Sequence, residues 1–280
     1  MLRFWLITST LLSALAIVFV LGFLVHASWP VVQEHGLGFI VEQEWYPYEN
    51  LFGMVPVILG SLWSILLALL IAVPLAVAAA ICSAELLPLW TRSWTRMAME
   101  LMAGIPSVVY GLIGLWVLLP LLENHLDMLT GRSLLAAGLL LAMMILPTIM
   151  VLSEEAVHSV RKEQREAATN LGMDWLAVMQ TIVLPQAWPS IRVATLLGLG
   201  RAMGETVAVM LVVGSIDRIP QPFYNLLQPA QTLTSRIGRE MGEASMGSVH
   251  WAALMSGGLL LAVIATAIAL LALRGQGRRL

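Results

Sequence analysis

Charge is scarce in this chain of 280 residues. Only 11% of its residues are Asp, Glu, Lys or Arg, whereas 59% are hydrophobic and the mean hydropathy is +0.86. A soluble domain carries roughly 25% charged residues, so most of this chain's surface is predicted to face lipid. The net charge of −2 excludes the basic surface typical of proteins that bind nucleic acid, and no nucleic-acid partner is expected.

Cysteine is nearly absent, and no nucleotide-binding loop is present. Because Cys82 is the one cysteine, the sequence can form no internal disulfide and no cysteine cluster for a metal. The five histidines are scattered without ligand spacing, so neither a metal nor a cofactor is expected. No segment reads G-x-x-x-x-G-K-[ST], the loop that cradles nucleotide phosphates. The chain is therefore not expected to be an enzyme that hydrolyses ATP by itself.

Long apolar runs are abundant. Each has about 20 or more residues, enough for a helix to cross a hydrocarbon core of about 30 Å. Strand-type alternation is absent, so we predict an all-α, polytopic helical bundle, with residues 1–280 as a single transmembrane domain. The first run follows Arg3 and could be a cleaved signal peptide, but its length favours a retained helix. The six predicted spans are 4–25, 54–82, 98–122, 132–153, 192–214 and 250–273.

Basic residues gather on one side of the membrane. With six crossings, the face opposite the two termini carries only Arg132, Arg218, Arg236 and Arg239. The positive-inside rule then places both termini in the cytoplasm, with an inner loop at 154–191 and an outer loop at 215–249. The basic residues of the inner face are Arg3, Arg92, Arg96, Arg161, Lys162, Arg165, Arg192, Arg274, Arg278 and Arg279.

The inner loop has the pattern of two short helices with a break between them. Gly172 suits the left-handed conformation that ends a helix. Asp174 can cap a second helix running to about Ile182, and Pro185 is predicted to stop it. The alternative is an ordinary amphipathic loop on the inner face. The spacing of certain residues within this loop argues against that alternative.

From Glu166 to Pro185 the loop matches a family signature. It reads E-A-A, three residues, Gly, nine residues, Ile, one residue, Leu-Pro, and it resembles the EAA loop of binding-protein-dependent ABC importer permeases. The resemblance implies a type I (MetI-like) architecture in which this loop docks on an ATPase and couples it to transport. The signature residues are Glu166, Ala167, Ala168, Gly172, Ile182, Leu184 and Pro185.

Four other stretches resemble the permeases of phosphate importers, the PstC type. They are EWYPYENLFGMVPVILGSL (44–62), AGIPSVVYGLIGLWVLLPLL (103–122), LGRAMGETVAV (199–209) and LLQPAQTLTSRIGREMGEA (226–244). The resemblance implies phosphate import by alternating access in a bacterial inner membrane. It also implies a PstA-like second permease, a PstB-like ATPase dimer and a PstS-like periplasmic phosphate-binding protein. Residues 1–43 resemble these permeases only in having one span followed by an outer loop.

Two opposite charges, Arg201 and Glu205, interrupt the fifth apolar run. Four residues apart, they are predicted to share one helix face, and a charge at this depth must face protein or water. Three roles are open: a self-neutralising pair that packs helices, a proton relay, or a site where an anion meets the guanidinium. The family resemblance favours the third role. In that role Arg201 meets phosphate, and Glu205 balances the charge of the guanidinium and orients it.

Other residues could line the same pathway. Thr206 adds a hydroxyl beside the pair. Pro106 either opens local backbone groups toward a pathway or only kinks the helix, and Ser107 and Tyr110, which follow it, could line the path. At the outer mouth, Arg236 and Arg239 could guide an anion, or they could belong to a solvated loop or a partner contact. The alternative functions are a permease for another oxyanion (molybdate, tungstate or sulfate), a proton-coupled secondary transporter, and a membrane scaffold that transports nothing.

Overall fold

The computed structural model describes the backbone of residues 2–276 and the side chains of residues 4–270. Arg278 and Arg279, two of the basic residues behind the predicted orientation, lie outside the described residues. The helices in chain order are α1 (Leu2–His35), α2 (Val55–Ile81), α3 (Leu89–Gly104), α4 (Ser107–Ile113), α5 (Leu119–Leu126), α6 (Leu134–His158), α7 (Lys162–Asn170), α8 (Trp175–Val178), α9 (Leu184–Gly204), α10 (Val207–Val212), α11 (Leu233–Glu240) and α12 (Val249–Gln276).

Shorter elements join these helices. Two 3-10 turns and a two-stranded antiparallel hairpin lie between α1 and α2, and three π-helical turns interrupt the later helices. These elements are η1 (Gly38–Ile40), β1 (Trp45–Tyr46), η2 (Pro47–Glu49), β2 (Leu51–Phe52), η3 (Cys82–Leu86), η4 (Gly114–Leu118) and η5 (Met179–Val183).

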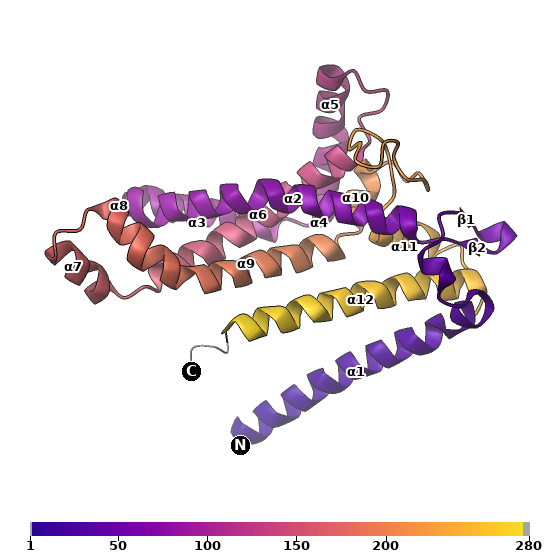
Figure 1. The fold of residues 1–280 in the computed structure, drawn as a ribbon, viewed down its shortest axis with the longest axis horizontal. Coiled ribbons are helices and arrows are strands. Elements are labelled where there is room, and N and C mark those ends of the chain that lie inside the picture. Colours follow the sequence, from indigo (N-terminus) through magenta and orange to yellow (C-terminus); the bar gives the residue numbers. More distant parts are fainter. Residues whose placement is uncertain (1, 277–280) are drawn as a thin grey trace.

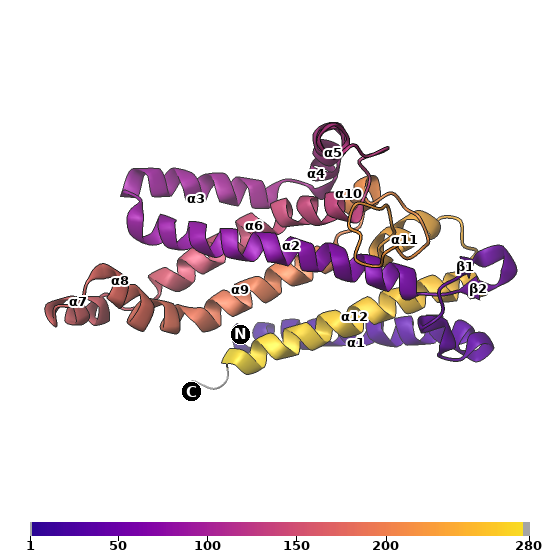
Figure 2. The ribbon, with the colours of Figure 1, turned by 45° about the horizontal axis from the view of Figure 1, so that its top comes forward.

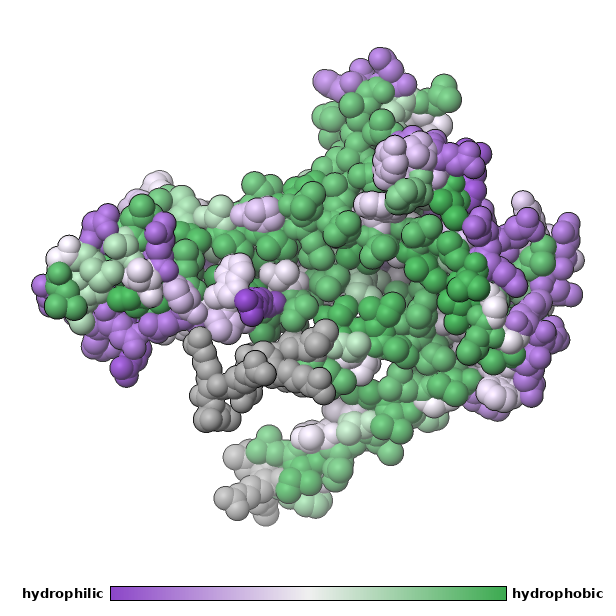
Figure 3. Space-filling view, in the orientation of Figure 1, coloured by the Kyte–Doolittle hydropathy of each residue, from purple (hydrophilic) through white to green (hydrophobic). Residues whose placement is uncertain are grey.

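The helical bundle has six spans, as predicted. The described residues contain six helices long and apolar enough to cross a membrane: Phe4–His35, Val55–Leu86, Ser107–Leu126, Leu134–His158, Trp175–Gly204 and Val249–Leu270. Apolar side chains cover the middle of the molecule, whereas polar ones gather at its two ends (Figure 3). This distribution is the one expected of a bundle surrounded by lipid.

Helix α6 forms the centre of the bundle. Of its most apolar stretch 67% is buried, against 28% or less in the other spans. It packs along α2, α3 and α9. Helix α2 approaches it closely because Ala68, Ala72, Ala76 and Ala80 repeat every fourth residue and are all fully buried. Small residues at this spacing allow helix backbones to approach in a membrane.

The third span is broken, so the prediction of one helix over 98–122 is wrong. Helix α3 ends at Gly104, Ile105 and Pro106 have extended backbones, and α4 begins at Ser107. Proline has no N–H to continue the helix and disfavours helical geometry in the residue before it. Past the break, α5 turns away from the long axis of the bundle (Figures 1 and 2).

The fifth span is also broken, near the end of the bundle at which residues 215–249 lie. Helix α9 ends at Gly204, Glu205 is extended (φ −75°, ψ 121°), and α10 begins at Val207. Glycine is a weak helix former, and Thr234 of α11 donates a hydrogen bond to the Glu205 carbonyl across 2.8 Å. The predicted helix over 192–214 is therefore two helices, with Glu205 and Thr206 in the gap.

Pro185 does not stop a helix, which corrects the prediction. The helix that begins at Trp175 continues through Pro185 to Gly204, and the π-helical turn η5 (Met179–Val183) ends two residues before the proline. A proline inside a helix lacks one donor and crowds the carbonyl four residues back. A π-helical turn changes the spacing of the hydrogen bonds in this region, which accommodates the ring without a break.

Helix α11 lies within 215–249, the segment predicted to be outer, and folds back against the bundle. The end of the bundle near α11 is called the outer end, and the end with α7 and α8 the inner end, after the predicted orientation. It contacts α2, α10 and α12. At the opposite end, α7 and α8 protrude from the bundle, and the first turn of α1 and the last turn of α12 lie toward that same end (Figures 1 and 2). Both described ends of the chain are therefore on the side of α7 and α8.

Candidate functional site

The Arg201 side chain, in the last turn of α9, reaches two neighbouring helices. Its Nη1 donates to Thr148 Oγ1 of α6, and its Nη2 donates to the Ala103 carbonyl at the end of α3, both at 3.0 Å. These contacts join positions 53 and 98 residues apart in the chain. Arg201 is half-buried and lies where the break after α3 meets the end of α9.

Tyr110 supports the same break from the other side. It is 2% exposed, and its hydroxyl donates to the Met102 carbonyl at 2.9 Å. The last carbonyls of a helix lack partners within it and carry partial negative charge. Arg201 and Tyr110 therefore complete the end of α3 together. Ser107, the first residue of α4, is half-buried and lies in the same short helix as Tyr110. That Ser107 and Tyr110 line the pathway stays a prediction.

Glu205 does not pair with Arg201, so the prediction of a shared helix face is wrong. Its Oε1 accepts a hydrogen bond from the Ala208 amide at 3.3 Å, at the start of α10. Together with Ser61, Thr232 and Thr234 it lines a small space between α2, α9 and the outer segment. Its carboxylate therefore contacts the start of α10 and makes no ion pair with Arg201.

Thr206 connects the break in the fifth span to α11. It is half-buried, and its methyl group lies 2.6 Å from where a side-chain carbon on Gly238 would stand. Gly238 is therefore required for α11 to lie this close. With the bond from Thr234 to the Glu205 carbonyl, the contact ties the gap at 205–206 to the outer segment.

The guanidinium of Arg201 keeps its charge available. None of the ion pairs within residues 4–270 includes Arg201, and both of its acceptors are neutral oxygens. An arginine has more N–H donors than these two contacts use, and a guanidinium fork suits the oxygens of a tetrahedral oxyanion. The arrangement can hold an anion where a bare positive charge would otherwise cost about 2.5–3.5 kcal/mol.

Arg236 is buried in an ionic cluster, so it does not belong to a solvated loop. It is 1% exposed, pairs with Asp217, and lies 3.9 Å from Glu240 and 4.1 Å above the Trp45 ring. Burial lowers the pKa of Arg236 from the usual guanidinium value, while Asp217 and Glu240 oppose that shift. Glu240 also accepts from Trp45 Nε1 at 3.0 Å. The cluster joins α11 to the segment between α1 and α2 (36–54).

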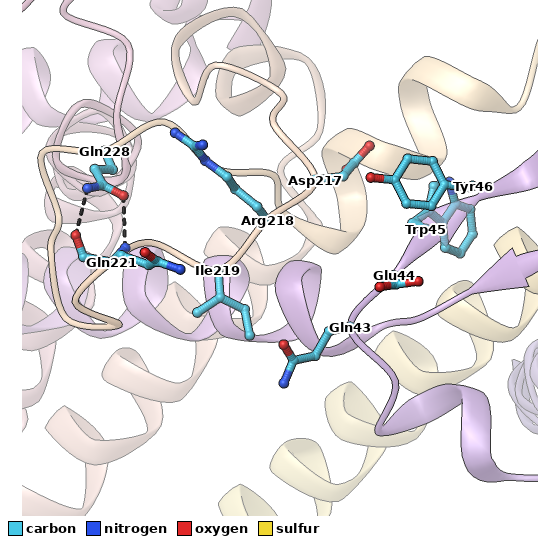
Figure 4. A pocket seen from close by; sticks show the side chains of 9 residues that line it. All are labelled: Gln43, Glu44, Trp45, Tyr46, Asp217, Arg218, Ile219, Gln221 and Gln228. Atoms are coloured by element: carbon cyan, nitrogen blue, oxygen red, sulfur yellow. Dashed lines mark hydrogen bonds between the residues drawn. The ribbon is translucent and has the colours of Figure 1, made fainter.

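A polar cavity of about 370 Å³ opens beside this cluster at the outer end. Figure 4 shows Glu44 and Tyr46 on one side of it and Asp217 and Arg218 on the other. Within the outer segment, Gln228 Nε2 donates to the Gln221 carbonyl at 2.7 Å. The segment between α1 and α2 and the segment 215–249 thus line one polar cavity.

At the inner end, α7, α8 and the turn between them form a compact unit, the inner hairpin (162–178). Gly172 adopts φ +85° just after α7, and Asp174 accepts from the Ala177 amide at 3.0 Å, so both predicted caps are confirmed. Ala168 is buried, whereas Glu166 and Ala167 are exposed. Of the E-A-A residues, Ala168 therefore lies on the face of the hairpin that packs against the bundle, and Glu166 and Ala167 lie on the exposed face, here called the free face.

The inner hairpin is fixed to the bundle. Ala168 packs in an apolar cluster with residues of α6, α8 and α9, and Ile182 and Leu184 lie against that cluster. Arg165 of α7 pairs with Glu85 of η3. Pro185 itself is exposed. A unit anchored this way can pass a push on its free face to α6 and α9.

The free tip of the inner hairpin is apolar. Leu171 is 84% exposed, and Trp175 and Leu176 are about half exposed, although they lie at the polar end of the molecule (Figure 3). Exposed apolar groups in such a place are typical of a protein–protein contact.

Sequence reasoning missed an ionic cluster at the inner end of α6. Glu154 is fully buried and accepts from Arg92 Nε at 2.8 Å and Ser83 Oγ at 3.0 Å. Arg96 pairs with Glu155 at 2.6 Å. The paired acidic residues at the end of an apolar run were the available signal. Within the described part of the chain, no group of His, Cys, Asp and Glu side chains could hold a metal ion.

Comparisons with known proteins agree with this geometry. The model of the family described as "Binding-protein-dependent transport system inner membrane component" matches residues 72–278. The probable ABC transporter permease protein YqgH of Bacillus subtilis is 37% identical, covering 81% of this chain and 73% of its own. The phosphate transport system permease protein PstC of Haemophilus influenzae is 33% identical, covering 96% and 88%.

Solved structures show the same fold. A chain of the bacterial alginate ABC transporter, in complex with its alginate-bound periplasmic protein, has a TM-score of 0.61 at 17% identity and covers 99% of this chain and 95% of its own. A chain of the methionine ABC transporter MetNI has a TM-score of 0.57 at 18% identity, over 78% and 92%. The predicted type I importer permease architecture is confirmed.

Proposed function

The chain belongs to the family of binding-protein-dependent transport system inner membrane components, and on that premise we propose that it is the permease subunit of an ATP-driven importer of inorganic phosphate. It is a multi-pass membrane protein of the ABC importer permease type. The relatives named PstC support phosphate as its substrate, because they align over most of this chain.

The observation that carries the proposal is the state of Arg201. Its guanidinium lies at the meeting of two helix breaks and is held by neutral acceptors. A fixed positive charge with donors to spare attracts a phosphate ion, and weak competing contacts allow the ion to leave again, as a conduit requires. Glu205 and Thr206 lie in the break between α9 and α10. Ser107 and Tyr110 lie just after the break between α3 and α4.

ATP hydrolysis belongs to partner subunits in this proposal. A PstB-like ATPase dimer binds the inner hairpin through its exposed tip, and a PstA-like second permease supplies the other half of the pathway. A PstS-like binding protein delivers phosphate to the polar outer surface around the 370 Å³ cavity. Closure of the ATPases moves the hairpin, which is anchored to α6 and α9, and the pathway changes the face to which it opens.

The proposed location is the bacterial inner membrane, with both termini and the inner hairpin in the cytoplasm. The basic residues of the hairpin and of the segment around Arg92 support this orientation. The geometry agrees, because the described ends of the chain lie on the hairpin's side (Figure 1).

Reconstitution tests the function. The complex with its ATPase, second permease and binding protein is expected to take up phosphate only with ATP, in preference to sulfate, molybdate and tungstate. Uptake of another oxyanion at the higher rate would reassign the substrate. Uptake that follows a proton gradient and persists without ATP would replace the importer by a secondary transporter.

Substitution of Arg201 tests the site. Arg201→Gln keeps two polar groups but loses the charge, and phosphate uptake is expected to fall about 10- to 100-fold, the usual effect of losing hydrogen bonds to a charged group. Complex assembly, checked by size-exclusion chromatography, should be unchanged. Normal uptake by an assembled Arg201→Gln complex would remove Arg201 from the pathway.

A further inference from the structure

Thr148 interrupts the most apolar part of the central helix. It is the one polar side chain in LLLAMMILPTIMVL (139–152) of α6. Its neighbours Pro147 and Ile149 are buried, whereas Thr148 is half-buried. A hydroxyl at such a position needs a partner, and the partner here is Arg201, which donates to its Oγ1 at 3.0 Å.

Two acceptors on two helices hold the Arg201 fork. One is the Ala103 carbonyl, a backbone group, and the other is the Thr148 hydroxyl. An arginine side chain has several rotatable bonds, and aiming its donors costs conformational entropy unless contacts restrict them. Thr148 is β-branched, so its own side-chain rotamer is restricted, and it is the side chain that orients the fork.

The chemistry of the acceptor matters as much as its place. A carboxylate in this position would neutralise the guanidinium and compete with an incoming anion. A hydroxyl orients the same N–H groups and does not neutralise the positive charge of the Arg201 guanidinium. Glu205 does not provide this orientation, because its carboxylate turns toward α10.

We infer that Thr148 is a positioning residue, which aims the Arg201 guanidinium at the transported oxyanion without neutralising it. This inference rests on the proposed function, since it requires that Arg201 meet the anion. Thr148 acts through Arg201, so removing its hydroxyl weakens transfer of the anion and leaves the coupling of the ATPase to the hairpin intact.

The test measures phosphate taken up per ATP hydrolysed in the reconstituted complex, with phosphate-loaded binding protein at saturation. Thr148→Val keeps the shape and removes the hydroxyl. It is expected to lower this ratio about ten-fold, the effect of losing one hydrogen bond to a charged group. Thr148→Ser restores the hydroxyl and should restore the ratio. Thr148→Ala serves as a second hydroxyl-free variant if the valine complex does not assemble.

A matched control and a double variant separate positioning from structure. Thr195→Val removes a half-buried threonine whose hydroxyl donates only to the Ile191 carbonyl of its own helix, and it should leave the ratio unchanged. Thr148→Val combined with Arg201→Gln should be no worse than Arg201→Gln alone, because contacts that act as a unit are not additive.

The outcomes are distinguishable. An unchanged ratio in Thr148→Val, or a double variant in which the two losses multiply, overturns the positioning role while Arg201→Gln still defines the site. A parallel fall of uptake and ATP hydrolysis in both the valine and serine variants makes Thr148 structural. Normal transport by Arg201→Gln would reject the proposed site and this inference together.

Discussion

Two arginines in this chain, Arg236 and Arg201, differ in the charge of the groups that bind them. Arg236 is surrounded by carboxylates and an aromatic ring, whereas Arg201 is bound by a hydroxyl and a backbone carbonyl. A guanidinium paired with carboxylates is neutralised and holds structure together. One held by neutral oxygens stays available to an anion. The partners, rather than the residue type, separate the structural arginine from the candidate functional one.

The buried cluster gives a prediction at the scale of one residue. Arg236→Ala leaves Asp217 and Glu240 without their buried counter-charge, which is expected to lower the free energy of unfolding by about 3–5 kcal/mol. Thermal unfolding of the purified protein in detergent measures the change. The control is Arg239→Ala, which contacts the same two carboxylates at 3.7 Å but is 43% exposed. Its loss should be about 0–1 kcal/mol, and equal losses would contradict a buried cluster.

Helix ends, more than helix interiors, make up the candidate site. The breaks at Ile105–Pro106 and Glu205–Thr206 release backbone groups that Arg201, Tyr110 and Thr234 then satisfy. From the sequence, Pro106 indicated a kink or a local opening within one helix, and the structure shows a complete break there. Pro185 seemed an equal signal for a helix end, but η5 accommodates it. Whether a proline breaks a helix depends on the packing around it, which local sequence does not contain.

The inner hairpin gives a prediction at the scale of an element. Gly172 has φ +85° with open space where a side chain would stand, so a substitution there strains the backbone without a clash. Gly172→Val, a β-branched residue disfavoured at positive φ, is expected to change the angle between α7 and α8 and to cut phosphate uptake about ten-fold. ATPase assays with the loaded binding protein should show hydrolysis uncoupled from uptake.

Asparagine provides the control at the same position. Because Asn tolerates the left-handed conformation that ends helices, Gly172→Asn should couple nearly as well as the wild type. Equal losses in the valine and asparagine variants would mean that side-chain bulk at the docking face, rather than backbone geometry, sets the coupling.

At the scale of the whole molecule, the face drawn in Figure 3 has two polar ends and a polar tip at α5, with an apolar middle between them. The outer end combines the β1–β2 hairpin with the segment around α11, and the inner end carries the inner hairpin. Helix α11 reaches from the outer ionic cluster to the Glu205 carbonyl, so events at the outer surface are mechanically connected to the gap in the fifth span.

The orientation of the molecule is testable because the chain has a single cysteine. In a Cys82→Ser background, Tyr48→Cys in the exposed outer turn should react with a membrane-impermeant thiol reagent in spheroplasts. Thr169→Cys in the exposed face of α7 should react only after the membrane is permeabilised. The reverse pattern would invert the proposed topology, and uptake by each variant confirms that it is assembled.

The sequence by itself determined the features that depend on local chemistry. Apolar runs predicted six spans, and Gly172 and Asp174 predicted the two helices of the inner hairpin and their caps, since each depends on residues a few positions apart. The tertiary structure alone decided which groups meet. Arg201 finds Thr148 and Ala103 instead of Glu205, because a helix break separates the near pair while packing joins positions 53 and 98 residues apart.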